Sequence, residues 1–266
     1  MLKSVDTSSQ GTQDQAGELT KVPPVTLVFW IAKILATTLG ETGGDALSMT
    51  LDLGYAVSSI IFLAFFVAAL AAQLRSHHYH PRCYWAVVVA TTTVGTTTSD
   101  YFDRTLGLGY IKSSIILLLL VVGVLWAWRR TTGAVAIDRV TTRQNEMFYW
   151  FTILVSNTLG TALGDFVATS TGLGFERGAC VFAGLIAIVA LAHFFTRAPK
   201  SGLFWAAYVL TRPLGATLGD TLTKPHGEGG LALGRISSSL VMVAAMVVLV
   251  AVTSLRRLPS ATGREG

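Results

Sequence analysis

One pattern occurs four times along the 266 residues of this chain. Each copy contains an aspartate, a glycine five residues before it, and a tryptophan fifteen residues before it that follows another aromatic residue. The four aspartates are Asp45, Asp100, Asp165 and Asp220. A repeat of this length is typical of architectures in which one small structural unit is duplicated and packed against its copies.

The other positions of the repeat hold small and aromatic residues. The glycines are Gly40, Gly95, Gly160 and Gly215; the tryptophans are Trp30, Trp85, Trp150 and Trp205; and the residues directly before the aspartates are Gly44, Ser99, Gly164 and Gly219. A Leu-Gly pair follows each aspartate, delayed by five residues in the fourth copy, where Pro225, His226 and Gly227 are inserted. Each copy therefore predicts a helix, a short polar turn and a second helix.

The composition places these helices in a membrane. Hydrophobic residues make up 52% and charged residues only 13% of the chain, whereas a soluble domain carries about 25% charged residues. Apolar segments near the length that crosses a bilayer occur at 25–40, 55–74, 84–99, 110–128, 148–164, 174–195, 203–219 and 234–254. The sequence predicts an all-α protein with eight transmembrane helices, whose four repeats share one orientation around a pseudo-symmetry axis along the membrane normal.

Charge and cysteine content narrow the class further. The net charge of +5 comes from scattered residues and not from one dense basic block, which argues against a nucleic-acid partner. Cys83 and Cys180 lie far apart and outside any metal-binding spacing. We expect no cofactor and no enzymatic activity, since nucleotide-binding and hydrolase motifs are absent from the sequence.

Basic residues also predict orientation and domain organisation. Thirteen of the twenty Lys and Arg residues fall on the side shared by both termini, which places both termini in the cytoplasm. The expected segments are a flexible cytoplasmic tail (1–22), a first membrane half (23–128), a charged cytoplasmic linker (129–146), a second membrane half (147–255) and a cytoplasmic tail (256–266).

The first helix of each repeat carries a polar stripe. Residues three, four and seven positions apart share one face of a helix, and this face runs from the tryptophan to the aspartate. Between them it holds small or polar residues, including Thr37, Thr92, Asn157, Arg212, Glu41 and Lys33. The second helices are bulky and apolar all round, so we expect them to face lipid and the first helices to form an inner ring that brings the carboxylates together.

Two interpretations of the carboxylates compete. Ionisable residues within a membrane span indicate a functional site, and oxygen ligands suit Mg²⁺, Ca²⁺, Mn²⁺, an alkali ion or a proton. The predicted ligands are Asp45, Asp100, Asp165, Asp220 and Glu41, with Thr37, Thr92 and Asn157. Structural ion pairing is the alternative, with Arg104, Lys112, Arg177 and Arg235 as candidate partners.

The remaining stripe residues also allow alternatives. Gly40, Gly44, Gly95, Gly160, Gly164, Gly215 and Gly219 either pack helices closely or permit a helix break before the aspartate. The tryptophans form either an aromatic belt at the membrane surface or a gate. Lys33 and Arg212 are internal counter-charges to the carboxylates, or they bind an anionic substrate.

The aromatic-Trp pair and the Gly-x-x-x-(Gly/Ser)-Asp motif resemble those of a family of bacterial inner-membrane proteins built from four tandem two-helix repeats. The resemblance covers about residues 25 to 254 and implies topology and location, because the family carries no assigned activity. We predict a proton-coupled transporter of a small cation, plausibly a divalent metal ion. Its partners would be the lipid bilayer, the cation or proton, and possible further copies of itself. A channel or organic-solute carrier, and a membrane scaffold or sensory protein, are the alternatives.

Overall fold

The computed structural model describes residues 21–76, 78–135, 140 and 142–255, and the regular structure within these residues is helical. The eight long helices are α2 (Leu27–Asp45), α3 (Gly54–Arg75), α4 (Pro81–Asp100), α5 (Tyr110–Thr132), α6 (Arg143–Asp165), α7 (Phe175–Phe195), α8 (Lys200–Thr223) and α9 (Arg235–Leu255). The described part of the chain therefore contains the eight helices that the repeat pattern predicts.

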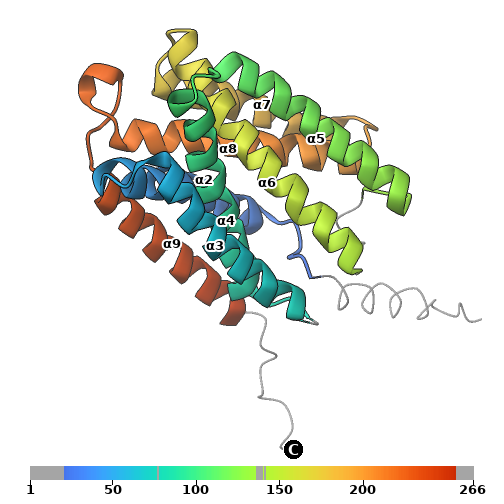
Figure 1. The fold of residues 1–266 in the computed structure, drawn as a ribbon. Coiled ribbons are helices and arrows are strands. Elements are labelled where there is room, and N and C mark those ends of the chain that lie inside the picture. The colour runs from blue at the N-terminus through green and yellow to red at the C-terminus, as the bar shows by residue number, and fades with distance from the viewer. Residues whose placement is uncertain (1–20, 77, 136–139, 141, 256–266) are drawn as a thin grey trace, which may run out of the picture.

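The first helices of the four repeats form an inner ring. Helix α2 contacts α4, α4 contacts α6, α6 contacts α8, and α8 contacts α2. The second helix of each repeat lies outside this ring and packs mainly on the first helix of the following repeat: α3 on α4, α5 on α6, α7 on α8, and α9 on α2 (Figure 1). Because the last pairing joins the end of the chain to its beginning, the two predicted halves interleave into one bundle.

Glycines allow the inner helices to approach closely. A Cβ added to Gly40 would lie 2.4 Å from the Thr92 Cβ, and one added to Gly215 would lie 2.9 Å from the backbone carbonyl carbon of Thr37. The same contact joins each repeat to the next, as the pairs Gly40–Thr92, Gly95–Asn157, Gly160–Arg212 and Gly215–Thr37. In each pair a glycine of one inner helix receives the residue that lies eight positions before the aspartate in the next.

The helix break lies after the aspartate and not before it. Helices α2, α4 and α6 run unbroken through their glycines to the aspartate, and the π-helical turns Ala46–Thr50, Tyr101–Thr105 and Phe166–Ser170 begin at the next residue. In the fourth repeat the α-helix continues to Thr223, and the insertion forms the 3-10 turn His226–Glu228. Of the two alternatives for these glycines, the structure therefore shows the close packing of helices, and the break before the aspartate is absent from the described helices α2, α4 and α6.

The recurring Leu-Gly pair has a backbone cause. The glycines that begin the second helices have φ of 73° at Gly54, 80° at Gly109, 77° at Gly174 and 79° at Gly234. Only glycine adopts this left-handed region without steric cost. The pair thus marks the reversal from the turn into the outer helix.

Five helices in the described residues are long and apolar enough to cross a bilayer. These are α3, α5, α7, α9, and α6 together with its π-helical turn. Helices α2, α4 and α8 are as long but carry the polar stripe, so their membrane crossing stays a prediction. The outer helices and α6 differ in how far they are covered by protein. The apolar windows of the four outer helices are 11 to 28% buried, whereas that of α6 is 72% buried.

The predicted linker and the predicted tails are described only in part. Helix α5 continues to Thr132 and α6 begins at Arg143, so both ends of the predicted linker 129–146 are helical. The Thr142 hydroxyl accepts a hydrogen bond from the Asn145 backbone N–H (3.2 Å) and caps α6. The predicted tails 1–22 and 256–266 lie outside the described residues, apart from Lys21, which pairs with Glu146 (2.8 Å), and the buried Val22.

Candidate functional site

The end of the inner ring that holds the tryptophans, here called the aromatic end, is closed by packed rings. Trp85, Trp150 and Trp205 are at most 7% exposed, and the hydroxyls of Tyr84 and Tyr149 lie 2.7 Å apart. The Tyr84 ring contacts both Trp85 (5.3 Å between centroids) and Trp150 (5.4 Å). A belt needs side chains that face the membrane surface, so the burial of these three tryptophans argues against a belt at their positions. Trp30 is only half-buried and packs on Phe29 and Phe204.

Arg212 lies across the middle of the inner ring. It is fully buried, and its guanidinium donates hydrogen bonds to Glu41 Oε2 (2.9 Å) and Thr161 Oγ1 (2.7 Å), and also to Thr96 Oγ1. These three partners belong to α2, α6 and α4, so one side chain from α8 joins all the other inner helices. Its ion pair with Glu41 matches the counter-charge that the sequence suggested.

Lys33 is the second basic residue in the middle of the ring. Its side chain is fully buried, donates to Asn157 Oδ1 (3.3 Å), and places Nζ 4.3 Å from the centroid of the Tyr208 ring. Among the described residues no carboxylate lies within 4.0 Å of it. Lys33 therefore connects α2 to α6 but does not pair with a carboxylate in this structure.

The other end of the ring, the carboxylate end, holds five buried carboxylates that we call the carboxylate cluster. They are Glu41, Asp45, Asp100, Asp165 and Asp220, each at most 2% exposed. Glu41, Asp45 and Asp100 each offer an oxygen within 4.8 Å of the others. Carboxylates this close repel one another unless cations or protons lie between them.

Two basic side chains link aspartates of different repeats within the cluster. Each stands four residues after the aspartate of its own repeat and reaches the aspartate of the following repeat. The contacts are Arg104 Nε to Asp100 Oδ1 (3.0 Å), Arg104 Nη2 to Asp165 Oδ2 (3.0 Å), Lys224 Nζ to Asp220 Oδ1 (3.3 Å) and Lys224 Nζ to Asp45 Oδ2 (3.7 Å). The pairing is thus two-fold, because repeats two and four supply the base while repeats one and three supply only acids.

A further base connects the cluster to the surface. Arg235 Nε lies 3.4 Å from Asp45 Oδ2, and the side chains of Arg104 and Arg235 are 26% and 25% exposed. Of the four candidate partners that the sequence named, Arg104 and Arg235 make ion pairs. Lys112 and Arg177 are exposed and make none among the described residues.

Several cluster oxygens lack a hydrogen bond. Neither oxygen of Asp100 accepts one, and neither does Oδ1 of Asp220, in the part of the chain that is described. Buried carboxylate oxygens are ordinarily satisfied by a donor or an ion. The ion pairs to Arg104 and Lys224 are close but poorly aligned, so these oxygens remain able to accept a cation or a proton.

The predicted hydroxyl and amide ligands lie away from the cluster. Thr37, Thr92 and Asn157 precede their aspartates by eight residues, about 12 Å along a helix. The Thr37 hydroxyl donates to the Thr211 carbonyl (3.2 Å), and the Thr92 hydroxyl donates to the Ala36 carbonyl (3.1 Å). In this structure these residues join the inner helices and do not extend the cluster.

Lys224 is the cluster residue that sequence reasoning missed. Its spacing of four residues after Asp220 repeats the spacing of Arg104 after Asp100, which is the separation at which helical side chains pair. Burial lowers the pKa of Lys224, but the charges of Asp220 and Asp45 raise it, and the net pKa lies above the usual value. The two aspartates therefore favour the charged form of Lys224 within the cluster.

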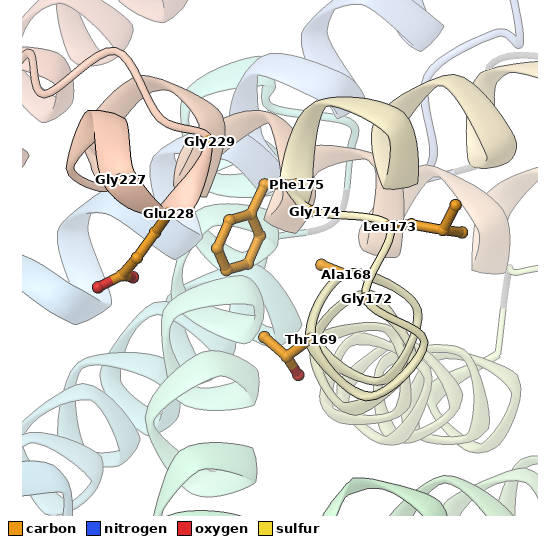
Figure 2. A pocket seen from close by; sticks show the side chains of 9 residues that line it. All are labelled: Ala168, Thr169, Gly172, Leu173, Gly174, Phe175, Gly227, Glu228 and Gly229. Carbon is orange, nitrogen blue, oxygen red and sulfur yellow. The ribbon is translucent and has the colours of Figure 1, made fainter.

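A hollow of about 510 Å³ lies between the turn of residues 227–229 and the segment of residues 168–175. It is lined by Ala168, Thr169, Gly172, Leu173, Gly174, Phe175, Gly227, Glu228 and Gly229. Figure 2 shows the Phe175 ring between the turn of residues 227–229 and the segment of residues 168–174. The centroid of this ring lies 5.7 Å from Lys224 Nζ, although Lys224 itself does not line the hollow.

Helices with lipid-compatible outer faces around an inner polar ring define a helical membrane protein with an internal four-fold repeat. The repeat described as "Repeat of Unknown Function (DUF347)" matches residues 28–79, 83–134, 148–198 and 203–258, and the chain belongs to this family. Comparisons with curated proteins and with solved structures found no match. The four-repeat resemblance is confirmed, and the activity has to be argued from the site.

Proposed function

We propose that this protein is a multi-pass membrane transporter that carries a small divalent cation in exchange for protons. The observation that carries the proposal is the approach of Glu41, Asp45 and Asp100, three buried carboxylates with oxygens within 4.8 Å of one another. Carboxylates within a membrane bundle are costly and mark ion or proton pathways. Oxygen-only ligands suit hard cations such as Mg²⁺, Mn²⁺ or Ca²⁺.

The charge of the cluster supports a cationic substrate. Five carboxylates contact four basic side chains, which are Arg104, Arg212, Lys224 and Arg235. One negative charge is left without a basic partner in surroundings where net charge is unfavourable. A bound cation or a proton removes that charge, which is the chemistry that proton exchange requires.

The middle of the ring favours a carrier over a channel. A cation moving along the ring axis from the cluster would meet the buried guanidinium of Arg212 and then the buried side chain of Lys33. We propose that the inner helices rearrange to expose the cluster to one side and then to the other. The π-helical turns directly after the aspartates are candidate hinges, because such turns often occur at functional positions.

The proposed placement in the membrane follows from surface chemistry. Large apolar side chains, such as those of Ile60 in α3, Leu119 in α5 and Phe194 in α7, are exposed on the outer helices, where they would meet lipid. We propose that all eight helices cross a bacterial inner membrane, that the repeat axis runs along its normal, and that both termini are cytoplasmic. The carboxylate end would then face outward, and the aromatic end would form the cytoplasmic gate.

Flux in proteoliposomes tests the proposal. Uptake of Mg²⁺, Mn²⁺, Ca²⁺, Zn²⁺, Na⁺ and K⁺ would be measured with and without a proton gradient for the wild type, Asp45→Asn and Asp100→Asn. Asp103→Asn is the matched control, because Asp103 is also buried but bonds to Ser99 and Ser113. We expect gradient-dependent flux of a divalent cation, lost in both cluster variants and retained in the control.

Two results would contradict the proposal. Equal flux in the wild type and both cluster variants would exclude the carboxylates as ligands. Absence of flux for every cation, with cluster variants that fold normally, would favour the organic-solute carrier or the membrane scaffold.

A further inference from the structure

We infer that Lys224 is a tethered counter-cation that occupies the carboxylate cluster in the absence of metal and moves away from Asp45 when a divalent cation binds. This inference rests on the proposed function, and it names the device by which the site would distinguish its empty state from its loaded state. It also assigns a role to the insertion that distinguishes the fourth repeat from the other three.

The contacts that hold the Lys224 side chain in the cluster are weak. Among the described residues its ammonium donates no hydrogen bond, and its two carboxylate contacts are 3.3 and 3.7 Å long. Arg104, the equivalent base of the second repeat, bonds to the hydroxyls of Tyr55 (3.2 Å) and Tyr110 (3.1 Å) and makes two ion pairs of 3.0 Å. Of the two bridging bases, Lys224 is therefore the one that can leave at lower cost.

Lys224 contacts a carboxylate that is also a candidate metal ligand. Lys224 Nζ lies against Oδ2 of Asp45, and Asp45 is one of the three residues whose oxygens come within 4.8 Å of one another. Departure of the ammonium releases an oxygen at the place where a metal would sit. A metal and Lys224 therefore compete for the same carboxylate.

The net charge of the cluster changes when Lys224 leaves it. With Lys224 in place, the five carboxylates and four bases of the cluster carry one net negative charge. With Lys224 removed they carry two, which a divalent cation neutralises completely. A low-dielectric site favours neutral combinations, so a divalent cation is fully balanced only when Lys224 has left the cluster.

The Lys224 backbone is held in place, so only its side chain has to move. The Lys224 carbonyl accepts a hydrogen bond from the Ala232 N–H (3.0 Å), and a Cβ on Gly230 would lie 2.0 Å from that carbonyl oxygen. The Phe175 ring lies 5.7 Å from the ammonium, and the Glu228 side chain points away from this ring (Figure 2).

Equilibrium binding of Mn²⁺ to the purified full-length protein tests the inference, with the wild type compared with Lys224→Gln. Arg177→Gln is the control, because Arg177 is an exposed base that makes no ion pair among the described residues. Removal of the competing cation should tighten Mn²⁺ binding by about tenfold or more, while the control should match the wild type. Equal or weaker binding by Lys224→Gln would overturn the inference.

A measurement on the wild type remains informative if Lys224→Gln does not fold. The Lys224 side chain is 8% exposed in the ion-paired state, so an amine-acylating reagent should modify it slowly. Mn²⁺ should raise the labelling of Lys224, measured by mass spectrometry, several-fold relative to the exposed Lys112. Unchanged or reduced labelling in the presence of bound Mn²⁺ would contradict displacement.

The outcomes separate the inference from the proposed function. Binding by Lys224→Gln with little binding by the wild type supports competition by Lys224. Equal binding by both proteins refutes the competition but leaves the metal site in place. If no protein binds Mn²⁺, Mg²⁺ or Ca²⁺, the proposed function fails and the inference fails with it.

Discussion

The two ends of the inner ring are closed by opposite chemistry. At the aromatic end, neutral rings pack on one another, and Tyr84 and Tyr149 share a hydrogen bond. At the carboxylate end, five acids and four bases hold the helices together, yet oxygens of Asp100 and Asp220 lack hydrogen bonds. Buried groups without a hydrogen bond among the described residues occur at both ends, but those of Trp150, Trp205 and Tyr208 at the aromatic end are neutral, whereas those at the carboxylate end belong to carboxylates. Only the carboxylate end is therefore suited to exchange a charge.

The largest expected effect comes from the charge that supports the carboxylate end. Arg212→Gln leaves Glu41 buried without its partner, and we expect a loss of about 3–5 kcal/mol in the free energy of unfolding. Chemical denaturation in detergent micelles would measure it. The double variant Arg212→Gln/Glu41→Gln should recover part of the loss, and a double variant as unstable as the single one would refute this ion pair as the cause.

The next effect tests the contacts that hold the ring between its two ends. Gly215→Ala places a methyl group 2.9 Å from the Thr37 backbone, and we expect a loss of about 2–3 kcal/mol. Gly184→Ala on the outer helix α7 meets nothing within 4 Å and should be neutral or stabilising. Thermal unfolding of both variants would show the difference, and equal midpoints would rule out close packing at Gly215.

A smaller effect is expected at the aromatic end. Tyr84→Phe removes one hydroxyl of the 2.7 Å pair and leaves that of Tyr149 buried without its partner, at a cost of about 1–2 kcal/mol. The double variant Tyr84→Phe/Tyr149→Phe should be close to the wild type in stability. Mn²⁺ binding should stay unchanged in both, and weakened binding would show that the two ends are not independent.

The smallest effect concerns the turns that begin the outer helices. Gly54→Ala forces a residue with a side chain to φ of 73° in open space, so only backbone strain is added, and we expect a loss of about 1 kcal/mol. Gly123→Ala, in the middle of α5 and also free of neighbours, serves as the control and should not destabilise. Denaturation curves that coincide for the two variants would contradict the backbone explanation of the Leu-Gly pair.

The helices and the repeat could be predicted from the sequence because their signals are local. Hydropathy over about twenty residues locates each helix, and the Trp-to-Asp spacing identifies the four copies. Membrane crossing by the polar helices α2, α4 and α8 could not be established from composition, because these helices are covered by protein and need not be apolar. The packing of each outer helix on the following repeat also could not be predicted from the local sequence, because those contacts form only when the ring closes.

The candidate site was predicted in part. The sequence indicated that the carboxylates gather at one end of the ring, and the structure brings Glu41, Asp45 and Asp100 together. It did not indicate that Arg104 and Lys224 bridge successive repeats, because a spacing of four residues shows only the contact within one helix. The contacts to Asp165 and Asp45 join residues that are distant in sequence, 61 positions apart for Arg104 and 179 for Lys224.

Anomalous X-ray scattering from crystals soaked in Mn²⁺ tests the central claim most directly, because it locates the ion without assuming a transport assay. The account predicts one strong peak at the carboxylate end, within coordination distance of Glu41, Asp45 and Asp100, with Lys224 turned away from Asp45. A peak elsewhere in the bundle, or no peak under conditions where Mn²⁺ flux is measured, would contradict it.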